Sequence, residues 1–387
     1  MKIIYNITKN VLNNDLQVLL ASGLDWNLMS ELLFTEPGSL LMQDYIVFDS
    51  IAKTKRLTTV IDYILEHFND QSTMESQWKD KQASRVWEQM LRFCSEDDAE
   101  RIYHTLIQGK VSVLALDRCA NHPLQRLFEK CKTSELLTDI VEEISKCVEE
   151  ILQIKHIGIL NSLIKAASSV PEYQEQLLQS LLTWLGVKKE KRMQCFMFPH
   201  VLTVSRDLEV HRDAETKKVY FDTNLINYQG SLLLQGIIQM KNCKNYVLDN
   251  VRALSPDCLA DIGCHIFGCH ALDSLFLEKS PLLWEEKEEI LEIFKDYLPR
   301  LASDKYGSRV LDSMWAAQSM KSKCEMAKIL TINQKVLART SIGRLMTTKY
   351  QLELFQKSVK EWRNRISYPK DDKKKKRLFY DLLESTR

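Results

Sequence analysis

Small residues followed by an apolar helical stretch recur along this chain of 387 residues at a nearly constant interval. Successive copies are 45, 37, 38, 72, 38, 39 and 36 residues apart. A repeat of this length in helical sequence predicts stacked helical hairpins, because one hairpin cannot bury its apolar face alone. The interval of 72 equals two periods, so we expect that one copy near residue 195 has diverged or been replaced by an insertion, in one solenoid of about nine units. The anchors are Gly38, Ala83, Ala120, Gly158, Gly230, Gly268, Gly307 and Gly343.

Helical periodicity dominates the segments between these anchors. In residues 136–154 and 285–300, apolar side chains return at three- and four-residue steps, which is the spacing of one helix face. Ser255 followed by Pro256 is a favourable helix start, because serine caps the first turn and proline fits the first helical position. Glycine and proline number only 11 and 8, which excludes a loop-rich all-β protein and a low-complexity linker.

One segment interrupts the helical pattern. Strand-like alternation is confined to residues 199–204 and 217–221, which flank a charged stretch. We interpret residues 194–223 as an irregular insertion with a short hairpin. Four tryptophans lie within helical apolar patterns and are expected to be packing residues: Trp184, Trp284, Trp315 and Trp362.

Composition restricts where and with what this chain can act. No run of about 18 apolar residues is present, and the first residues lack a secretory signal, so no membrane partner is expected. Ten cysteines at scattered spacings indicate reduced thiols of an intracellular protein. The net charge of +1 provides no global attraction for nucleic acid, so a polyanion site must come from a local arrangement.

The residues after the anchors form a repeated polar triangle. Ser308, Arg309 and Asp312 share one edge of a helix, because positions i, i+1 and i+4 lie side by side. A flat side chain beside two hydrogen-bonding groups suits an RNA base, since the flat group stacks on the ring and the others reach the base edge. Equivalent triangles are Ser84, Arg85 and Glu88; Asn121, His122 and Gln125; and Cys269, His270 and Asp273.

This motif resembles a known repeat family. Tyr306-Gly307-Ser308-Arg309-Val310-Leu311-Asp312 is similar to the second helix of a Pumilio (PUF) repeat. Residues 304–315, supported by 120–128, 229–235 and 343–362, most resemble the nucleolar branch of that family. The resemblance covers residues 20–365, is specific from 225 to 362 and is weak before 80.

The resemblance implies an all-α fold, a curved right-handed superhelical α-solenoid of Pumilio-type repeats. Family members of this branch have about eleven such repeats, so about two further repeats would precede residue 1. They are non-catalytic, need no cofactor or metal, and bind single-stranded or partly structured precursor ribosomal RNA in the nucleolus. The resemblance further implies a monomer that assists 18S maturation within small-subunit precursor particles, by shielding a cleavage site at the 3′ end of the 18S sequence.

Departures from the family pattern limit the expected base reading. The third position of the triangle is Gln or Glu at Gln43, Glu88, Gln125 and Gln235, but differs at Leu163, Asp273, Asp312 and Thr348. The stacking position is leucine at Leu40, Leu160, Leu232 and Leu345. By the family's code, Ser with Glu suggests guanine and Asn with Gln suggests uracil. Asp312 is expected to pair with Arg309, and a binder driven by shape and backbone fits better than a strict reader.

The candidate RNA-binding set follows from the triangles and the resemblance. It contains Ser84, Arg85, Glu88, Asn121, His122, Gln125, Ser231, Gln235, Cys269, His270, Asp273, Ser308, Arg309, Asp312 and Arg344. The cluster Cys258, Cys264, His265, Cys269 and His270 lacks the ligand spacing of structural zinc sites, so buried thiols are expected there.

The expected organisation has four parts. Residues 1–193 form degenerate N-terminal repeats, 194–223 the insertion, 224–366 the C-terminal repeats with an end cap, and 367–387 a basic tail. The basic runs 188–192 and 373–377 are typical of a nuclear or nucleolar address, and could also hold RNA phosphates.

Two other functions remain open at this level. An armadillo- or HEAT-like protein scaffold would use the same surface for peptides, but those repeats run about 40–47 residues. A cytoplasmic Pumilio-type repressor of messenger RNA would keep complete reading sets in nearly every repeat, and half of the repeats here do not.

Overall fold

The computed structural model describes residues 32–52, 56–67, 71–187 and 196–367. The basic runs 188–192 and 373–377 and the first 31 residues lie outside this part. The chain divides into two compact units, Met1–Trp184 and Leu185–Arg387, and each is described by itself. Among the described residues, no helix has the length and apolar character needed to cross a membrane.

The first unit consists of helices of five to seventeen residues and one 3-10 turn. Their order is α3 Glu36–Ala52, α4 Arg56–His67, α5 Gln71–Lys79, α6 Ala83–Phe93, α7 Glu96–Ile102, the π-helical η1 Tyr103–Ile107, α8 Val111–Leu116, α9 Asn121–Phe128, α10 Ser134–Ser145, α11 Val148–Gln153, α12 Gly158–Ala167, the 3-10 turn η2 Pro171–Tyr173, and α13 Gln174–Trp184.

The second unit adds one two-stranded hairpin to the helical pattern. Its order is α15 Met197–Thr203, β1 His211–Arg212, β2 Val219–Tyr220, η3 Thr223–Leu225, α16 Tyr228–Gln239, η4 Lys241–Cys243, α17 Lys244–Ala253, α18 Pro256–Cys264, α19 Gly268–Phe276, α20 Trp284–Phe294, η5 Lys295–Tyr297, α21 Leu298–Ser303, α22 Gly307–Ala317, α23 Met320–Ile332, α24 Gln334–Leu337, α25 Ser341–Lys349, α26 Leu352–Lys357 and α27 Val359–Ser367.

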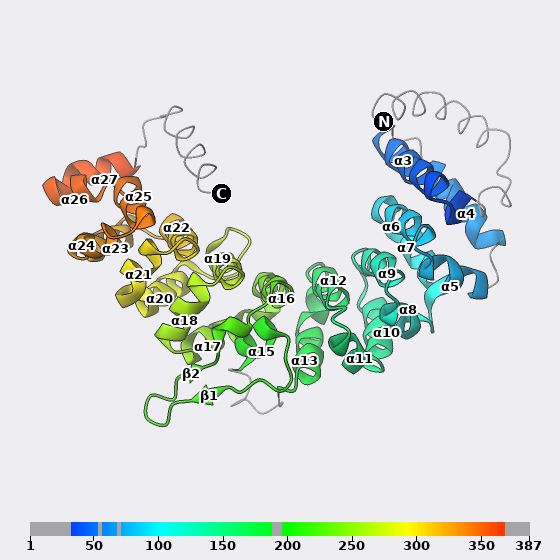
Figure 1. The fold of residues 1–387 in the computed structure, drawn as a ribbon, viewed down its shortest axis with the longest axis horizontal. Helices are drawn as coiled ribbons and strands as arrows, with labels where there is room; N and C mark the ends of the chain where they lie inside the picture. Colours follow the sequence, from blue (N-terminus) through cyan, green and yellow to red (C-terminus); the bar gives the residue numbers. More distant parts are fainter. Residues whose placement is uncertain (1–31, 53–55, 68–70, 188–195, 368–387) are drawn as a thin grey trace. The chain divides into compact units, whose positions relative to one another are not determined.

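The helices that contain or directly follow the small-residue anchors stack on one another, and we call them the anchor helices. In the first unit they are α3, α6, α9 and α12, and each packs against the next. In the second unit α16, α19 and α22 pack in the same way, and α25 follows (Figure 1). The predicted all-α repeat architecture is therefore confirmed.

Close backbone contact explains the small residues at the anchors. A Cβ atom added to Gly268 would lie 2.4 Å from the Ile262 carbonyl oxygen at the end of α18. Added to Gly343, it would lie 2.2 Å from the Leu337 carbonyl oxygen. Real Cβ atoms do not approach this closely, so the first turn of these anchor helices packs directly on the backbone of the preceding short helix.

A side chain three residues before the anchor fixes the same turn. Asp304 Oδ1 accepts hydrogen bonds from the backbone N–H groups of Tyr306 and Gly307, at 2.8 and 2.7 Å. These interactions satisfy donors at the start of the helix that have no partner within it. The same role is played by Thr35, Asp80, Asp117, Asn227, His265 and Thr340.

The 72 residues between the anchors Gly158 and Gly230 contain no additional repeat in the part that the structure describes. Between α12 and α16 the chain has only α13, α15 and the insertion, where other repeats have two or three helices. The Leu202 carbonyl oxygen at the end of α15 lies 2.2 Å from a Cβ built on Gly230, so α15 is the short helix that precedes an anchor. Among the described residues no diverged copy lies near residue 195, and the interval is one repeat lengthened by the insertion, in agreement with the second alternative.

The insertion contains the expected hairpin but differs from the prediction at its start. Residues 199–204, which have strand-like alternation, lie mostly in α15, and its seven residues are all buried. His211 pairs with Tyr220 and Arg212 with Val219. The hairpin is hydrogen-bonded to the turn between α17 and α18, where the Ser255 N–H donates to the Val219 carbonyl at 2.8 Å.

Tryptophans close the end of the second unit. Trp362 is fully buried, and its indole donates to the Tyr350 carbonyl at 2.8 Å. The Trp315 ring stacks on Tyr350 with centroids 4.2 Å apart. Trp184 is also buried, but Trp284 is 47% exposed at the start of α20, so its assignment as a packing residue is wrong.

The anchor contact makes a prediction about stability. Gly268→Ala should lower the free energy of unfolding by about 1–3 kcal/mol, because backbone atoms cannot yield to the new methyl group. Gly158→Ala is the matched control, since the atoms nearest to its Cβ belong to the flexible Gln125 amide. We expect the control to stay within about 1 kcal/mol of the parent. Urea unfolding followed by circular dichroism measures both, and equal losses would contradict the anchor contact.

Candidate nucleic-acid interface

The first position of each triangle is buried in the free protein. Ser84, Asn121, Ser231, Cys269 and Ser308 are all at most 5% exposed. Ser308 Oγ donates to the Lys305 carbonyl at 3.0 Å, and the Asn121 amide donates to the Asp117 carbonyl at 2.9 Å. Both polar side chains therefore donate hydrogen bonds to backbone carbonyl groups of the turn just before their own helix.

Two serines at this position instead join neighbouring anchor helices. Ser231 Oγ donates to the Phe267 carbonyl at 2.7 Å, and the Gln235 amide donates back to Ser231 Oγ at 3.1 Å. Ser39, Gln43 and the Gln82 carbonyl repeat this arrangement in the first unit. Because the serine hydrogen is used on the carbonyl, the amide must turn its NH₂ toward the serine.

The second position is the exposed one. Arg85, His122, His270 and Arg309 all extend from the surface of their anchor helices. Leu40 is 50% exposed, whereas Leu160 and Leu163 are 1% exposed, so α12 presents neither a stacking nor a reading side chain at the predicted positions. Asn161 and Lys165 face outward there instead.

Arg344 differs from the residues at the first position of other copies. It is exposed, whereas those residues are buried, and its guanidinium donates to the Ala338 carbonyl at 2.9 Å. Arg344 therefore hydrogen-bonds to the turn between α24 and α25, and its charged group stays exposed.

Carboxylates at the third position are held by cations one repeat further along. Glu88 Oε1 accepts from Arg126 Nε at 3.1 Å, across the contact between α6 and α9. Arg126 also binds Glu129, which in turn accepts from Lys165 at 3.0 Å. A ladder of alternating charges thus crosses three anchor helices.

Asp312 is held in the same way, and its expected pairing with Arg309 is wrong. Lys349 Nζ lies 2.6 Å from Asp312 Oδ2, and the Tyr350 hydroxyl donates to Oδ1 at 2.7 Å. Both partners come from the following repeat. Lys349 and Tyr350 bind the Asp312 carboxylate because they approach it from across the helix interface. The Arg309 side chain extends outward from the same helix and does not pair with it.

Asp273 is the one third-position carboxylate without an ion pair in the described part of the chain. Burial raises its pKa to about 6, although Ser313 hydrogen-bonds to it and the Arg309 charge opposes the shift. Its Oδ1 atom is buried and accepts no hydrogen bond among the described residues. The deprotonated, charged form of Asp273 therefore lowers the stability of the folded protein.

The cysteine and histidine cluster has a structural role. Cys258 and Cys269 are buried, and burial raises the pKa of both thiols to about 11. His265 Nδ1 accepts from the Phe267 and Gly268 N–H groups at 3.2 Å and so caps α19. No metal-binding group of three or more His, Cys, Asp or Glu side chains occurs among the described residues.

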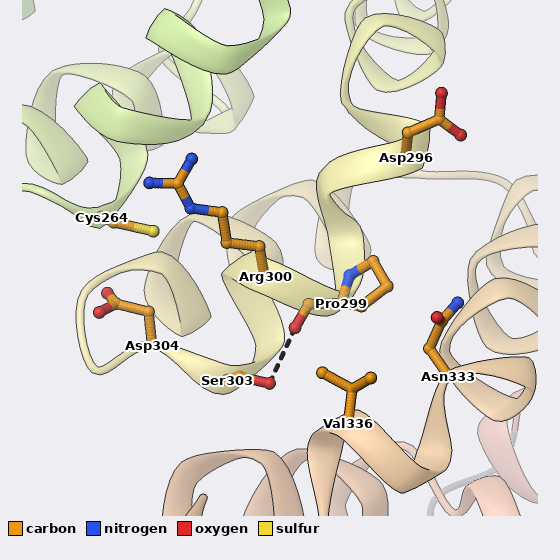
Figure 2. A pocket seen from close by; sticks show the side chains of 8 residues that line it. All are labelled: Cys264, Asp296, Pro299, Arg300, Ser303, Asp304, Asn333 and Val336. Carbon is orange, nitrogen blue, oxygen red and sulfur yellow. Dashed lines mark hydrogen bonds between the residues drawn. The ribbon is translucent and has the colours of Figure 1, made fainter. Parts of the chain in front are cut away.

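A hollow in the second unit is lined by eight residues of the short helices and turns (Figure 2). Two of its three charged groups are already used: Arg300 pairs with Asp261, and Asp304 caps α22, while Asp296 also lines the hollow. Ser303 donates to the Pro299 carbonyl at 2.9 Å. We therefore do not assign a ligand to it. The lining residues are Cys264, Asp296, Pro299, Arg300, Ser303, Asp304, Asn333 and Val336.

Sequence reasoning missed Arg126, Lys165 and Lys349. A residue of opposite charge one repeat period away would have indicated two of them. Arg126 follows Glu88 by 38 residues, and Lys349 follows Asp312 by 37. The capping side chains were also missed, although each stands three residues before its anchor.

Comparison with known proteins agrees with this architecture. Nucleolar protein 9 of Mus musculus is 26% identical over 338 residues, which cover 84% of this chain and 52% of that protein. Nucleolar protein 9 of Homo sapiens is 27% identical over 295 residues, covering 73% and 46%. The chain thus spans about half the length of these curated relatives.

Solved structures share the fold. A structure of APUM23 with GGAGUUGACGG has a TM-score of 0.69 at 17% identity, and covers 87% of this chain and 63% of that one. PUF-8 in complex with PBE-RNA has a TM-score of 0.58 at 13% identity, covering 87% and 89%. The family described as NOP9-like PUF repeat domain matches residues 12–345. This chain belongs to that family.

Proposed function

We propose that this chain is a non-catalytic RNA-binding protein whose anchor helices hold the RNA. The observation that carries the proposal is the positive charge of the anchor helices from α6 onward, which contrasts with the acidic helices α10 and α20. The anchor helix α3 is itself acidic, and α17 and α23 are net positive, so the contrast does not hold for every helix. The net charge of +1 conceals this contrast.

The seven anchor helices from α6 onward contain three carboxylates, Glu88, Asp273 and Asp312. They contain seven lysines or arginines: Arg85, Arg92, Arg126, Lys165, Arg309, Arg344 and Lys349. By contrast, α10 has four carboxylates and no lysine or arginine, and α20 has five carboxylates and one lysine. A polyanion is attracted to the first set and repelled by the second.

The few carboxylates on the anchor helices are also neutralised. Glu88 and Asp312 are ion-paired, and burial raises the pKa of Asp273. Meanwhile Arg85 and Arg309 are exposed and have no ion pair among the described residues. Flat cations of this kind stack on bases and also contact phosphates, which a peptide-binding scaffold does not require.

The target and compartment follow from the relatives. Proteins named Nucleolar protein 9 match most of this chain, and solved PUF structures contain RNA. We therefore propose precursor ribosomal RNA as the ligand, the nucleolus as the compartment, and assistance to 18S maturation by shielding a cleavage site. Repeats of residues 1–193 and 224–366 would bind as one monomer, with the fifteen candidate residues named above as the contact set.

Removing the exposed flat side chains tests this proposal. The variant Arg85→Ala/His122→Ala/Arg309→Ala should bind RNA at least tenfold more weakly, because each stacked base contributes about 1–3 kcal/mol. Fluorescence anisotropy with single-stranded RNA from the 3′ end of 18S and its downstream spacer measures the change.

The control variant Lys146→Ala/Lys241→Ala removes two exposed cations from other segments and should bind almost as the parent does. A scrambled RNA and the matching DNA separate base reading from backbone binding. If the parent protein binds none of these ligands at low salt, the RNA proposal fails and a protein scaffold becomes the better interpretation.

Asp273 gives a prediction about pH. Its raised pKa means that the folded state binds a proton more tightly than the unfolded state, so stability is lost as pH rises from about 4 to 6. Asp273→Asn, which imitates the protonated form, should therefore raise the melting temperature at pH 7.5 and change it little near pH 4.5.

Asp312→Asn is the matched control and should act in the opposite direction at pH 7.5, because it breaks the ion pair with Lys349. Melting curves at the two pH values measure both variants. A pH-independent gain for Asp273→Asn would show that charge burial is not its cause.

A further inference from the structure

The last four helices, α24 to α27, form an end cap with an unusual charge. Residues 334–367 contain eight lysines or arginines and two carboxylates, Glu353 and Glu361. All eight cations are exposed. The rest of the chain must then be net negative, because the whole chain has a net charge of only +1.

These cations are largely unpaired. Within the described ranges, only Lys349 forms an ion pair with a carboxylate, and its partner is Asp312 of the preceding repeat. Arg363 donates to Cys324 Sγ at 3.2 Å, which leaves its charge uncompensated. Elsewhere in the same unit, Arg252 and Lys295 are both bound to glutamates. Seven exposed cations without an ion pair among the described residues, against the two carboxylates of the same segment, give this part of the fold a positive potential that attracts a polyanion.

Aromatic packing makes the cap a rigid platform. Trp362 of α27 meets the Phe355 ring of α26 at 4.9 Å and the Trp315 ring of α22 at 6.0 Å, both edge to face. Trp362 is the one buried residue of α27, so the rest of that helix stays exposed or half-buried. A rigid surface loses little conformational freedom when a ligand binds it.

The anchor helix of this cap is not built to read a base. Arg344 occupies the position that holds a buried Ser, Asn or Cys in the other triangles, and the third position is the exposed Thr348. Contact here would therefore depend on charge alone and would be indifferent to sequence.

We propose that the end cap α24–α27 extends the RNA contact surface past the anchor helix α22, and holds phosphates of the strand there without reading its sequence. This inference rests on the proposed function. The ligand group is the sugar–phosphate backbone, because it alone repeats a negative charge along the strand at the spacing of exposed side chains.

The test compares two variants with the same loss of charge in the full chain. Lys357→Gln/Lys360→Gln/Arg365→Gln alters the cap, and Lys146→Gln/Lys241→Gln/Lys279→Gln alters exposed cations elsewhere. Affinity for the 18S-derived RNA and for its scramble is measured by anisotropy from low to moderate salt. Melting curves check that both variants fold.

The cap variant should reduce the slope of log affinity against log salt by about 2, since each lost contact to single-stranded RNA contributes about 0.7. The preference for the 18S-derived RNA over its scramble should stay as in the parent, and the control should keep the parent slope. Equal behaviour of the two variants overturns the inference, as does a loss of preference in the cap variant. An unmodified chain that binds no RNA overturns the proposed function instead.

Discussion

A close backbone contact recurs in both units between the first turn of an anchor helix and the short helix before it. Gly268 and Gly343 leave no room for a side chain there, and the residue three positions earlier caps the same turn. This contact fixes the rotation of the helix. Since successive residues turn by about 100°, fixing the first turn sets the direction of the side chains that follow it. After Gly268 and Gly307 the next residue is buried and the one after it exposed, whereas after Gly343 Arg344 is exposed and Leu345 is half-buried. The candidate interface is therefore a consequence of the packing.

The same regular spacing places charges of one repeat opposite charges of the next. Glu88 meets Arg126 at a separation of 38 residues, and Asp312 meets Lys349 at 37. Exposed ion pairs add little stability individually. Their larger effect is electrostatic, because they cancel the carboxylates of the anchor helices and leave Arg85 and Arg309 to set the sign of the surface potential.

The sequence predicted the parts of this structure that depend on local pattern. The anchors, the helical repeats and the exposure of Arg85 and His122 all follow from spacing along one helix. It could not predict the burial of Leu160, because Gly158 meets the Gln125 side chain and not the backbone of a preceding helix, so α12 lacks the contact that the other anchor glycines make. It also mispaired Asp312, since a local partner on the same helix was visible while Lys349 belongs to the next repeat. The doubled interval left two explanations open in the sequence, because an insertion and a degenerate repeat have similar lengths.

The third positions divide the anchor helices into two kinds of surface. Gln125 and Gln235 each donate one N–H within the protein and keep their amide oxygen for another donor. Glu88 and Asp312 are already bound by cations, so a base would have to displace an internal partner at a cost in free energy. Base-specific contacts are thus limited to a minority of repeats, while exposed arginines stand on the anchor helices α6, α22 and α25. On this surface charge must contribute more of the affinity than base identity does.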